Sequence, residues 1–121
     1  MGLGNTLDDA GQPEAALTAY DRALQVDAKR ASVWYNKGVT LGRLQRHQDA
    51  LAAYDQAIAL RPDDESAWYN RGVALARLNQ NQAAIAAFAE TLRINPHNAD
   101  AQANRELLVD KEGQISRTSA E

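Results

Sequence analysis

The sequence predicts an all-α fold, a stack of antiparallel helix pairs, and three observations support this prediction. The first is a repeat: residues 34–39 read Trp-Tyr-Asn-Lys-Gly-Val, and residues 68–73 read Trp-Tyr-Asn-Arg-Gly-Val. The second is the spacing of apolar residues, which follows a helical period on both sides of short polar stretches. The third is the composition, because 45% apolar residues, many of them Ala, suit thin contacts between helices rather than a thick core. A period of about 34 residues is typical of solenoids of helical hairpins.

Residues 1–30 are expected to form a first, incomplete unit. Reading back by one period, Gly4 and Leu7 occupy the places of a glycine and a leucine in the next unit. The segment lacks the first few residues of the period, including the tryptophan, and it has Ala28 where later units have Pro. We expect one complete helix here, over residues 15–26.

Residues 31–64 contain one full unit. Two apolar-periodic stretches flank the polar turn Gln45–Gln48, so the unit is predicted to be an αα-hairpin. Pro62 cannot continue the second helix. The carboxylates of Asp63 and Asp64 can then cap the N-terminus of the helix that follows.

Residues 65–98 repeat this plan, with the polar turn Asn79–Gln82 and a stop at Pro96. Residues 99 to about 113 are predicted to form one further helix that caps the stack. The last segment, 114–121, is polar and aperiodic and is predicted to be a disordered tail.

Two residue types of the repeat are expected to serve packing. A glycine occurs where the two helices of a hairpin must approach closely, so Gly38 should face Ala50, and the same pair recurs in the next unit. Trp34 and Trp68 are large enough to fill the gap to the neighbouring hairpin, and we favour packing over ligand binding as their role.

The recurring order of Trp, Gly, Ala, an aromatic residue, Ala and Pro resembles the tetratricopeptide repeat family. The resemblance covers about nine-tenths of the chain: a truncated repeat over 1–30, full repeats over 31–64 and 65–98, and the first helix of a fourth from 99 to about 113. It implies a right-handed superhelical α-solenoid of about three repeats with a C-terminal capping helix.

Composition and motifs argue against several functions. The chain has no Cys, which excludes disulfides, thiol nucleophiles and thiolate metal sites. Its two histidines, His47 and His97, each fall in a polar stretch without a second His at ligand spacing. A net charge of -3 without a basic stripe argues against nucleic acid as a partner. No apolar run approaches a membrane span, and no signal-peptide pattern occurs, so we expect a cytoplasmic location. We therefore predict no enzymatic activity, no metal, no cofactor and no membrane partner.

The family resemblance also implies where a ligand would bind. In that family the first helix of each hairpin lines a concave groove, and ten residues of this chain fall at such positions and are candidates for peptide binding. They are Asn5, Tyr35, Asn36, Val39, Arg43, Tyr69, Asn70, Val73, Arg77 and Asn104.

Three properties of this set favour a peptide ligand. Asn36, Asn70 and Asn104 recur at the repeat period, and an amide can both donate to and accept from the backbone of an extended peptide. The two tyrosines add apolar area with a hydroxyl group. Arg43 and Arg77 offer partners for carboxylates or phosphates. In the alternative interpretation, the asparagines bond only to the helix surface and the arginines are merely solvated.

One specific function within the family is not supported. In that family, the clamp that holds C-terminal peptides of heat-shock chaperones uses a Lys and an Asn in the first repeat. It uses an Asn in the second repeat, and a Lys and an Arg in the third. Only Asn5 and Asn36 match this pattern, because Met1, Ser66 and Asn70 stand in the other places. The cations that would hold a terminal carboxylate are missing.

We therefore predict a non-enzymatic adaptor whose groove binds a peptide or helix of a protein partner, with a bias toward acidic ligands. The alternative is a structural spacer or self-association module of a longer repeat array. It would form homo-oligomers through its incomplete, uncapped N-terminal repeat, because the ends of solenoids need polar caps. A third alternative, the regulatory domain of an enzyme, would require more chain.

Overall fold

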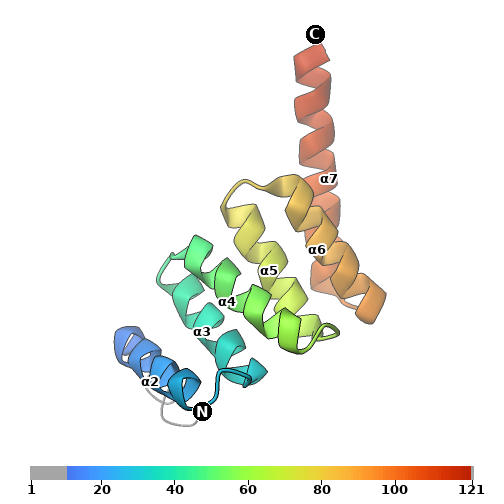
Figure 1. Cartoon of the computed structure of the whole chain (residues 1–121). Helices are drawn as coiled ribbons and strands as arrows, with labels where there is room; N and C mark the ends of the chain where they lie inside the picture. Colours follow the sequence, from blue (N-terminus) through green and yellow to red (C-terminus); the bar gives the residue numbers. More distant parts are fainter. Residues whose placement is uncertain (1–10, 121) are drawn as a thin grey trace.

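The computed structural model describes residues 11–120, with side chains as far as residue 114. Residues 11–120 form helices and no strand, and Figure 1 shows the helices following one another in a single row. The helices are α2 (Pro13–Val26), α3 (Ala31–Arg43), α4 (His47–Leu60), α5 (Glu65–Arg77), α6 (Asn81–Ile94) and α7 (Ala99–Ala120). Each helix packs mainly on its neighbours in the sequence, and α3 also touches α5. The predicted all-α stack of helix pairs is confirmed.

The helices α3 and α5 end in the same left-handed turn. Gln45 has a φ of 63° and Asn79 a φ of 60°, and Gly11, one period earlier, has a φ of 79°. The N–H of Arg46 donates to the carbonyl of Leu41 over 2.9 Å. This is the hydrogen bond of a Schellman motif that spans the larger number of residues. This motif turns the chain back at the same place in successive repeats.

Because a Schellman turn needs so few residues, the loops between paired helices are shorter than the sequence predicted. The stretches Gln45–Gln48 and Asn79–Gln82 were expected to be turns, but α4 already begins at His47 and α6 at Asn81. The N–H of Ala50 donates to the carbonyl of Arg46, the residue just before α4, over 2.9 Å, and this bond closes the first helical turn.

The predicted cap after Pro62 is confirmed at Asp64, and the structure adds an equivalent cap at Asn98, after Pro96, that was not predicted. The side chain of Asp64 accepts a hydrogen bond from the Ala67 N–H over 3.2 Å at the start of α5. Asn98 accepts one from the Ala101 N–H over 2.9 Å at the start of α7. Each cap satisfies an N–H group that the helix itself leaves without a partner.

Gly38 and Gly72 lie where the helices of a hairpin come close, and the atoms nearest to them belong to an aromatic ring rather than to the expected alanine. A Cβ atom at Gly38 would lie 2.5 Å from the ring of Tyr54, and one at Gly72 would lie 2.7 Å from the ring of Phe88. An aromatic ring therefore occupies the space that the glycine leaves open, where the sequence predicted contact with Ala50. The physical reason is reach: the ring extends across the hairpin from one turn further along the second helix.

Each full repeat is joined to the preceding one through its tryptophan. The indole N–H of Trp34 donates to the carbonyl of Ala28 over 2.8 Å. Lys37 lies 5.4 Å from the centre of the same ring, a cation–π distance, and 2.8 Å from the carboxylate of Asp21. One period later the same contacts are made by Trp68, Pro62, Arg71 and Asp55. The expected packing role of the tryptophans is confirmed.

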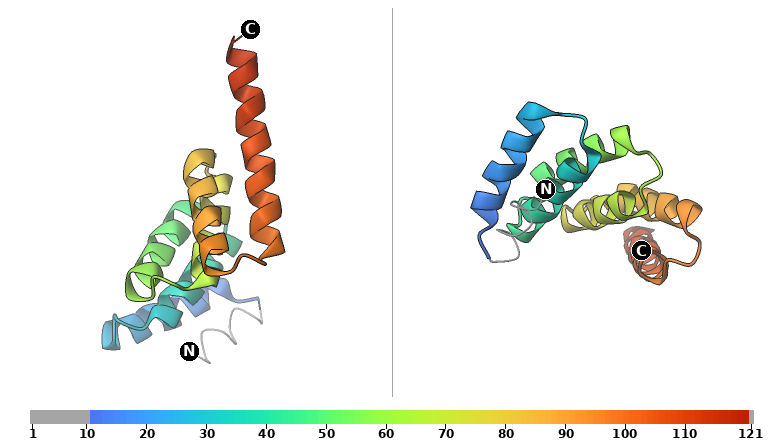
Figure 2. Two further views of the ribbon diagram at one scale, coloured as in Figure 1. Left: turned by 90° about the vertical axis from the view of Figure 1, so that its right-hand side faces the viewer. Right: turned by 90° about the horizontal axis from the view of Figure 1, so that it is seen from below.

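The last helix is longer than the sequence predicted. A helix to about Gly113 and a disordered tail over 114–121 were expected, whereas α7 continues to Ala120 and projects beyond the other helices (Figure 2, left). Gly113 does not end the helix, because a single glycine without a positive φ lowers helix stability by only about 1 kcal/mol and no proline follows it. Within residues 11–120, no helix combines the length and the apolar character needed to cross a membrane.

Candidate functional site

Nine of the ten predicted groove residues lie in the described part of the chain, all of them on α3, α5 or α7. Asn5 and the rest of the expected N-terminal edge, residues 1–10, lie outside the described residues. The chain follows an arc, with α2 and α7 at its two ends (Figure 2, right). We call the surface that these nine residues form on α3, α5 and α7 the groove face.

The asparagines of the groove face join successive repeats. The side-chain amide of Asn70 donates to the hydroxyl oxygen of Tyr35 over 3.0 Å. Asn104 donates to the hydroxyl of Tyr69 in the same way, also over 3.0 Å. Each bond thus joins a tyrosine of one repeat to the asparagine 35 residues later in the next, and in the first bond both residues belong to the repeated word at residues 34–39 and 68–73.

These bonds change what Asn70 can offer to a ligand. Its amide nitrogen also donates to the backbone carbonyl of Ser66 over 3.0 Å, so both of its N–H groups are used within the protein. The sequence predicted an amide that both donates and accepts. In the structure, the oxygen is the part of the Asn70 amide that a peptide could use, and it accepts.

The tyrosines of the groove face are half-buried rather than fully exposed. The ring of Tyr35 packs at a tilt on that of Tyr54, with 6.0 Å between ring centres, and Tyr69 packs on Phe88 at 5.6 Å. Burial, followed by the charge of Asp64, raises the pKa of the Tyr35 hydroxyl. This hydroxyl therefore stays protonated at neutral pH.

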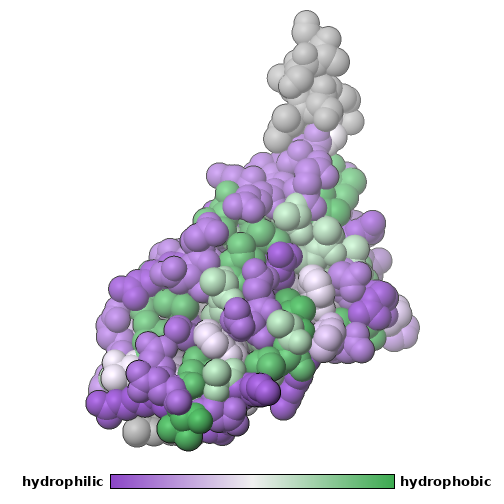
Figure 3. Space-filling model, in the orientation of Figure 1, coloured by the Kyte–Doolittle hydropathy of each residue, from purple (hydrophilic) through white to green (hydrophobic). Residues whose placement is uncertain are grey.

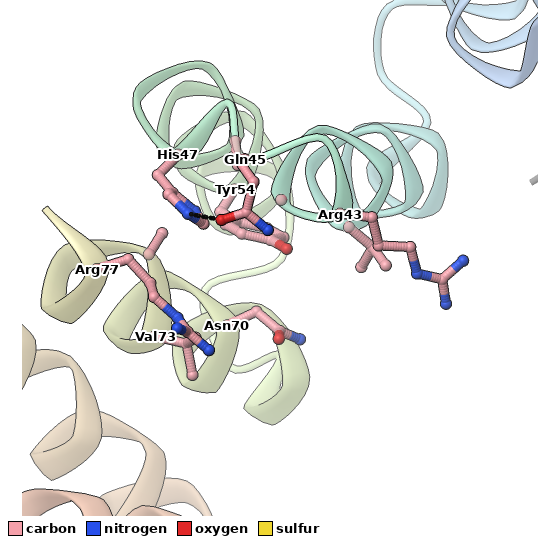
Figure 4. Close-up of a pocket in the computed structure, with 11 residues that line it drawn as sticks. Arg43, Gln45, His47, Tyr54, Asn70, Val73 and Arg77 are labelled. Carbon is pink, nitrogen blue, oxygen red and sulfur yellow. Dashed lines mark hydrogen bonds between the residues drawn. The ribbon is translucent and has the colours of Figure 1, made fainter. Parts of the chain in front are cut away.

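A pocket of about 250 Å³ opens on the groove face between α3, α4 and α5. We call it the polar pocket. Its lining residues are Val39, Gly42, Arg43, Gln45, His47, Ala50, Tyr54, Asn70, Val73, Ala74 and Arg77. Figure 4 shows that Arg77 extends over Val73 toward Asn70, whereas the guanidinium of Arg43 points away. Of the two arginines predicted as partners for carboxylates or phosphates, only Arg77 therefore extends over this pocket.

The other polar groups of this pocket come from α4 and the turn before it. His47 Nε2 and Gln45 Oε1 are 3.1 Å apart and hydrogen-bonded (Figure 4). Tyr54 is only 4% exposed, and its burial raises the pKa of the hydroxyl far above the ordinary value. Sequence reasoning missed these three residues because it considered only the first helix of each pair.

A second pocket, of about 370 Å³, opens on the groove face between α5, α6 and α7. We call it the apolar pocket. It is lined by Tyr69, Val73, Ala76, Arg77, Phe88, Asn104, Leu107 and Leu108. Leu107 lines this pocket and is 67% exposed.

The two pockets are related by the repeat. All residues of the apolar pocket except Tyr69 lie 34 positions after a residue of the polar pocket. The substitutions between them are all toward larger or less polar groups. Gly42 becomes Ala76, Tyr54 becomes Phe88, Val73 becomes Leu107, and Ala74 becomes Leu108.

Figure 3 shows the side of the molecule on which α4 and α6 lie nearest the viewer. Hydrophobic residues form separate patches among hydrophilic ones on this side.

The described residues contain no cluster of three or more His, Cys, Asp or Glu side chains that could hold a metal ion.

Two family models match the sequence, and both describe the tetratricopeptide repeat. One matches residues 41–109 and the other residues 1–65, so each covers more than half of the chain. A search of curated proteins gave no match.

Solved structures share the fold over most of this chain. The crystal structure of MamA superposes with a TM-score of 0.90 at 26% identity, covering 93% of this chain and 66% of the MamA chain. The second TPR domain of human RPAP3, in complex with the HSP70 peptide SGPTIEEVD, gives 0.84 at 25% identity and covers 88% and 89%. The first TPR of Spaghetti (RPAP3), bound to the HSP90 peptide SRMEEVD, gives 0.90 at 20% identity and covers 93% and 89%.

Proposed function

This chain belongs to the tetratricopeptide repeat family, and from this premise we propose that it acts in protein interaction by binding an extended peptide of a partner protein on its groove face. One observation carries the proposal: side chains from α3, α5 and α7 meet on this face around two pockets. A TPR domain 25% identical to this chain was solved with a bound peptide, which supports a peptide as the class of ligand.

The peptide backbone would be held by the amide oxygens of Asn36, Asn70 and Asn104, which we call the asparagine ladder. Asn70 accepts a peptide N–H through its oxygen, while its N–H groups stay on Tyr35 and Ser66. These internal bonds fix the orientation of the amide before the ligand arrives, which lowers the entropy lost on binding. The half-buried ring of Tyr35 adds apolar contact area beside this oxygen.

The experiment selects binders from a library of random extended peptides and measures one retained peptide by calorimetry. We expect the Asn36→Ala/Asn70→Ala double variant to bind it at least tenfold more weakly. This is the loss of affinity expected when a hydrogen bond to the peptide is removed and the peptide N–H is left without a partner. Tyr35→Phe is the comparison variant: it keeps the Asn70 oxygen but removes one of the two bonds that orient the amide, so it should weaken binding less than the double variant does. Equal affinity of the wild type and the double variant would remove the ladder from the mechanism.

A further inference from the structure

We infer that the groove face selects peptides by two side chains, an acidic one in the polar pocket and a large aliphatic or aromatic one in the apolar pocket. This inference deepens the proposed function and rests on it. The two pockets occupy equivalent places in successive repeats, so a single extended chain crossing α3, α5 and α7 would pass both. Their different linings then give each position its own preference.

The charges around the polar pocket favour a carboxylate. Its lining contains Arg43 and Arg77 and no Asp or Glu, and of the two guanidinium groups only that of Arg77 extends toward the other lining residues (Figure 4). Arg77 reaches across the pocket toward Asn70, where a carboxylate could accept two parallel N–H bonds (Figure 4). The hydroxyl of Tyr54 stays protonated and is a further donor on the inner wall.

Space for the acidic side chain comes from Gly42. A Cβ atom at this position would meet nothing within 4 Å, in contrast to Gly38 one helical turn earlier. The absence of a side chain at Gly42 keeps this side of the polar pocket open, and the pocket's volume of about 250 Å³ is enough for an Asp or Glu side chain together with water.

The apolar pocket favours a different side chain. Phe88 replaces the tyrosine on its inner wall and so removes the hydroxyl donor, while Leu107 and Leu108 bring apolar surface from α7. Leu107 remains 67% exposed, so a large apolar side chain of a ligand would remove part of its surface from water. Arg77 lies at the border and lines both pockets.

The test compares peptides retained from the random library with the starting library. We expect enrichment of peptides that carry both an Asp or Glu and a Leu, Ile, Phe or Trp at a fixed spacing. Retained peptides without this pair would overturn the inference and leave groove binding intact. If no peptide is retained, both the inference and the proposed function are wrong.

Variants then assign each preference to its pocket. Arg77→Gln should weaken an acidic peptide roughly tenfold to a hundredfold and leave its Asn or Gln analogue almost unchanged. Arg61→Gln, which removes the same charge at the end of α4 and outside both pockets, is the control. Gly42→Leu should block the acidic side chain by filling its space, and Gly42→Ala should block it less.

For the apolar pocket, Leu107→Asn should weaken the peptide severalfold and reduce the preference for its large apolar residue. Val109→Asn is the control, because Val109 is also exposed on α7 but lines neither pocket. A loss of affinity that is the same for Leu107→Asn and Val109→Asn would contradict the assignment. Circular dichroism of every variant identifies changes that act through the fold instead.

Discussion

Gly38 and Gly42 lie one turn apart on α3, and their surroundings are opposite. A Cβ atom at Gly38 would approach the Tyr54 ring to 2.5 Å, whereas one at Gly42 would meet nothing within 4 Å. The first glycine is therefore required by packing, and the second leaves a pocket open. Because both positions are glycine, the sequence alone does not reveal this difference.

These two glycines give a matched pair of stability predictions. Gly38→Ala should lower the free energy of unfolding by about 1–2 kcal/mol, because overpacking against a buried ring outweighs the better helix propensity of Ala. Gly42→Ala should raise it by about 0.5–1 kcal/mol, since only the propensity term acts. Urea denaturation of both variants measures these values. The account is contradicted if the two alanines change stability in the same direction.

Gln45 holds a backbone conformation that favours glycine. Its φ of 63° places it in the left-handed region, which costs a residue with a Cβ atom roughly 1–2 kcal/mol. Gln45→Gly should stabilise the protein by about 0.5–1 kcal/mol after the greater chain entropy of glycine is subtracted. Asn79→Gly is the comparison and should gain less, because Asn tolerates this region better than Gln does. Thermal unfolding of both variants would disprove the strain if neither gained stability.

At the scale of elements, α7 is attached differently from α3 and α5. Those helices each carry a tryptophan and a cation that contact the preceding repeat, but α7 has Gln102 in the tryptophan place. Arg105 is in the place of the cation, and the position for its carboxylate partner is Ala89. Polar bonds supply part of the contact instead, such as the 2.9 Å bond from Asn81 to Glu112.

Restoring the missing contacts should therefore stabilise α7. Gln102→Trp is expected to add about 1 kcal/mol by burying part of an indole against α6. Adding Ala89→Asp should contribute less than about 1 kcal/mol, because an exposed ion pair with Arg105 is weak. Slower amide hydrogen exchange in α7 is the measurement. Ala103→Trp, one position further around the helix, is the control, and an equal effect from it would show that the repeat contact is not responsible.

At the scale of the whole molecule, the sequence predicted the repeat architecture because one period controls the packing of every unit. The caps at Asp64 and Asn98 and the roles of Trp34 and Trp68 follow from short-range chemistry that recurs in each unit. Helix ends were less predictable: the turn before His47 is shorter than expected, since a left-handed Gln45 was not foreseen.

The candidate site could be predicted only in part. The period and the family pattern identified which positions of α3, α5 and α7 share a face. They could not show that the Asn70 amide is already bonded to Tyr35, or that Arg43 points away from the pocket. Both depend on side-chain directions and on contacts between three helices, and no single stretch of sequence contains that information.

Titration of a retained peptide, followed by NMR chemical shifts, shows whether a partner peptide binds across α3, α5 and α7. The account predicts that amide and side-chain signals of Asn70, Val73, Arg77, Asn104 and Leu107 shift on titration. Signals of Gln56 and Ala86, which are exposed on α4 and α6, should stay in place. Shifts concentrated on the exposed residues of α4 and α6, with those of the groove face unchanged, would contradict it.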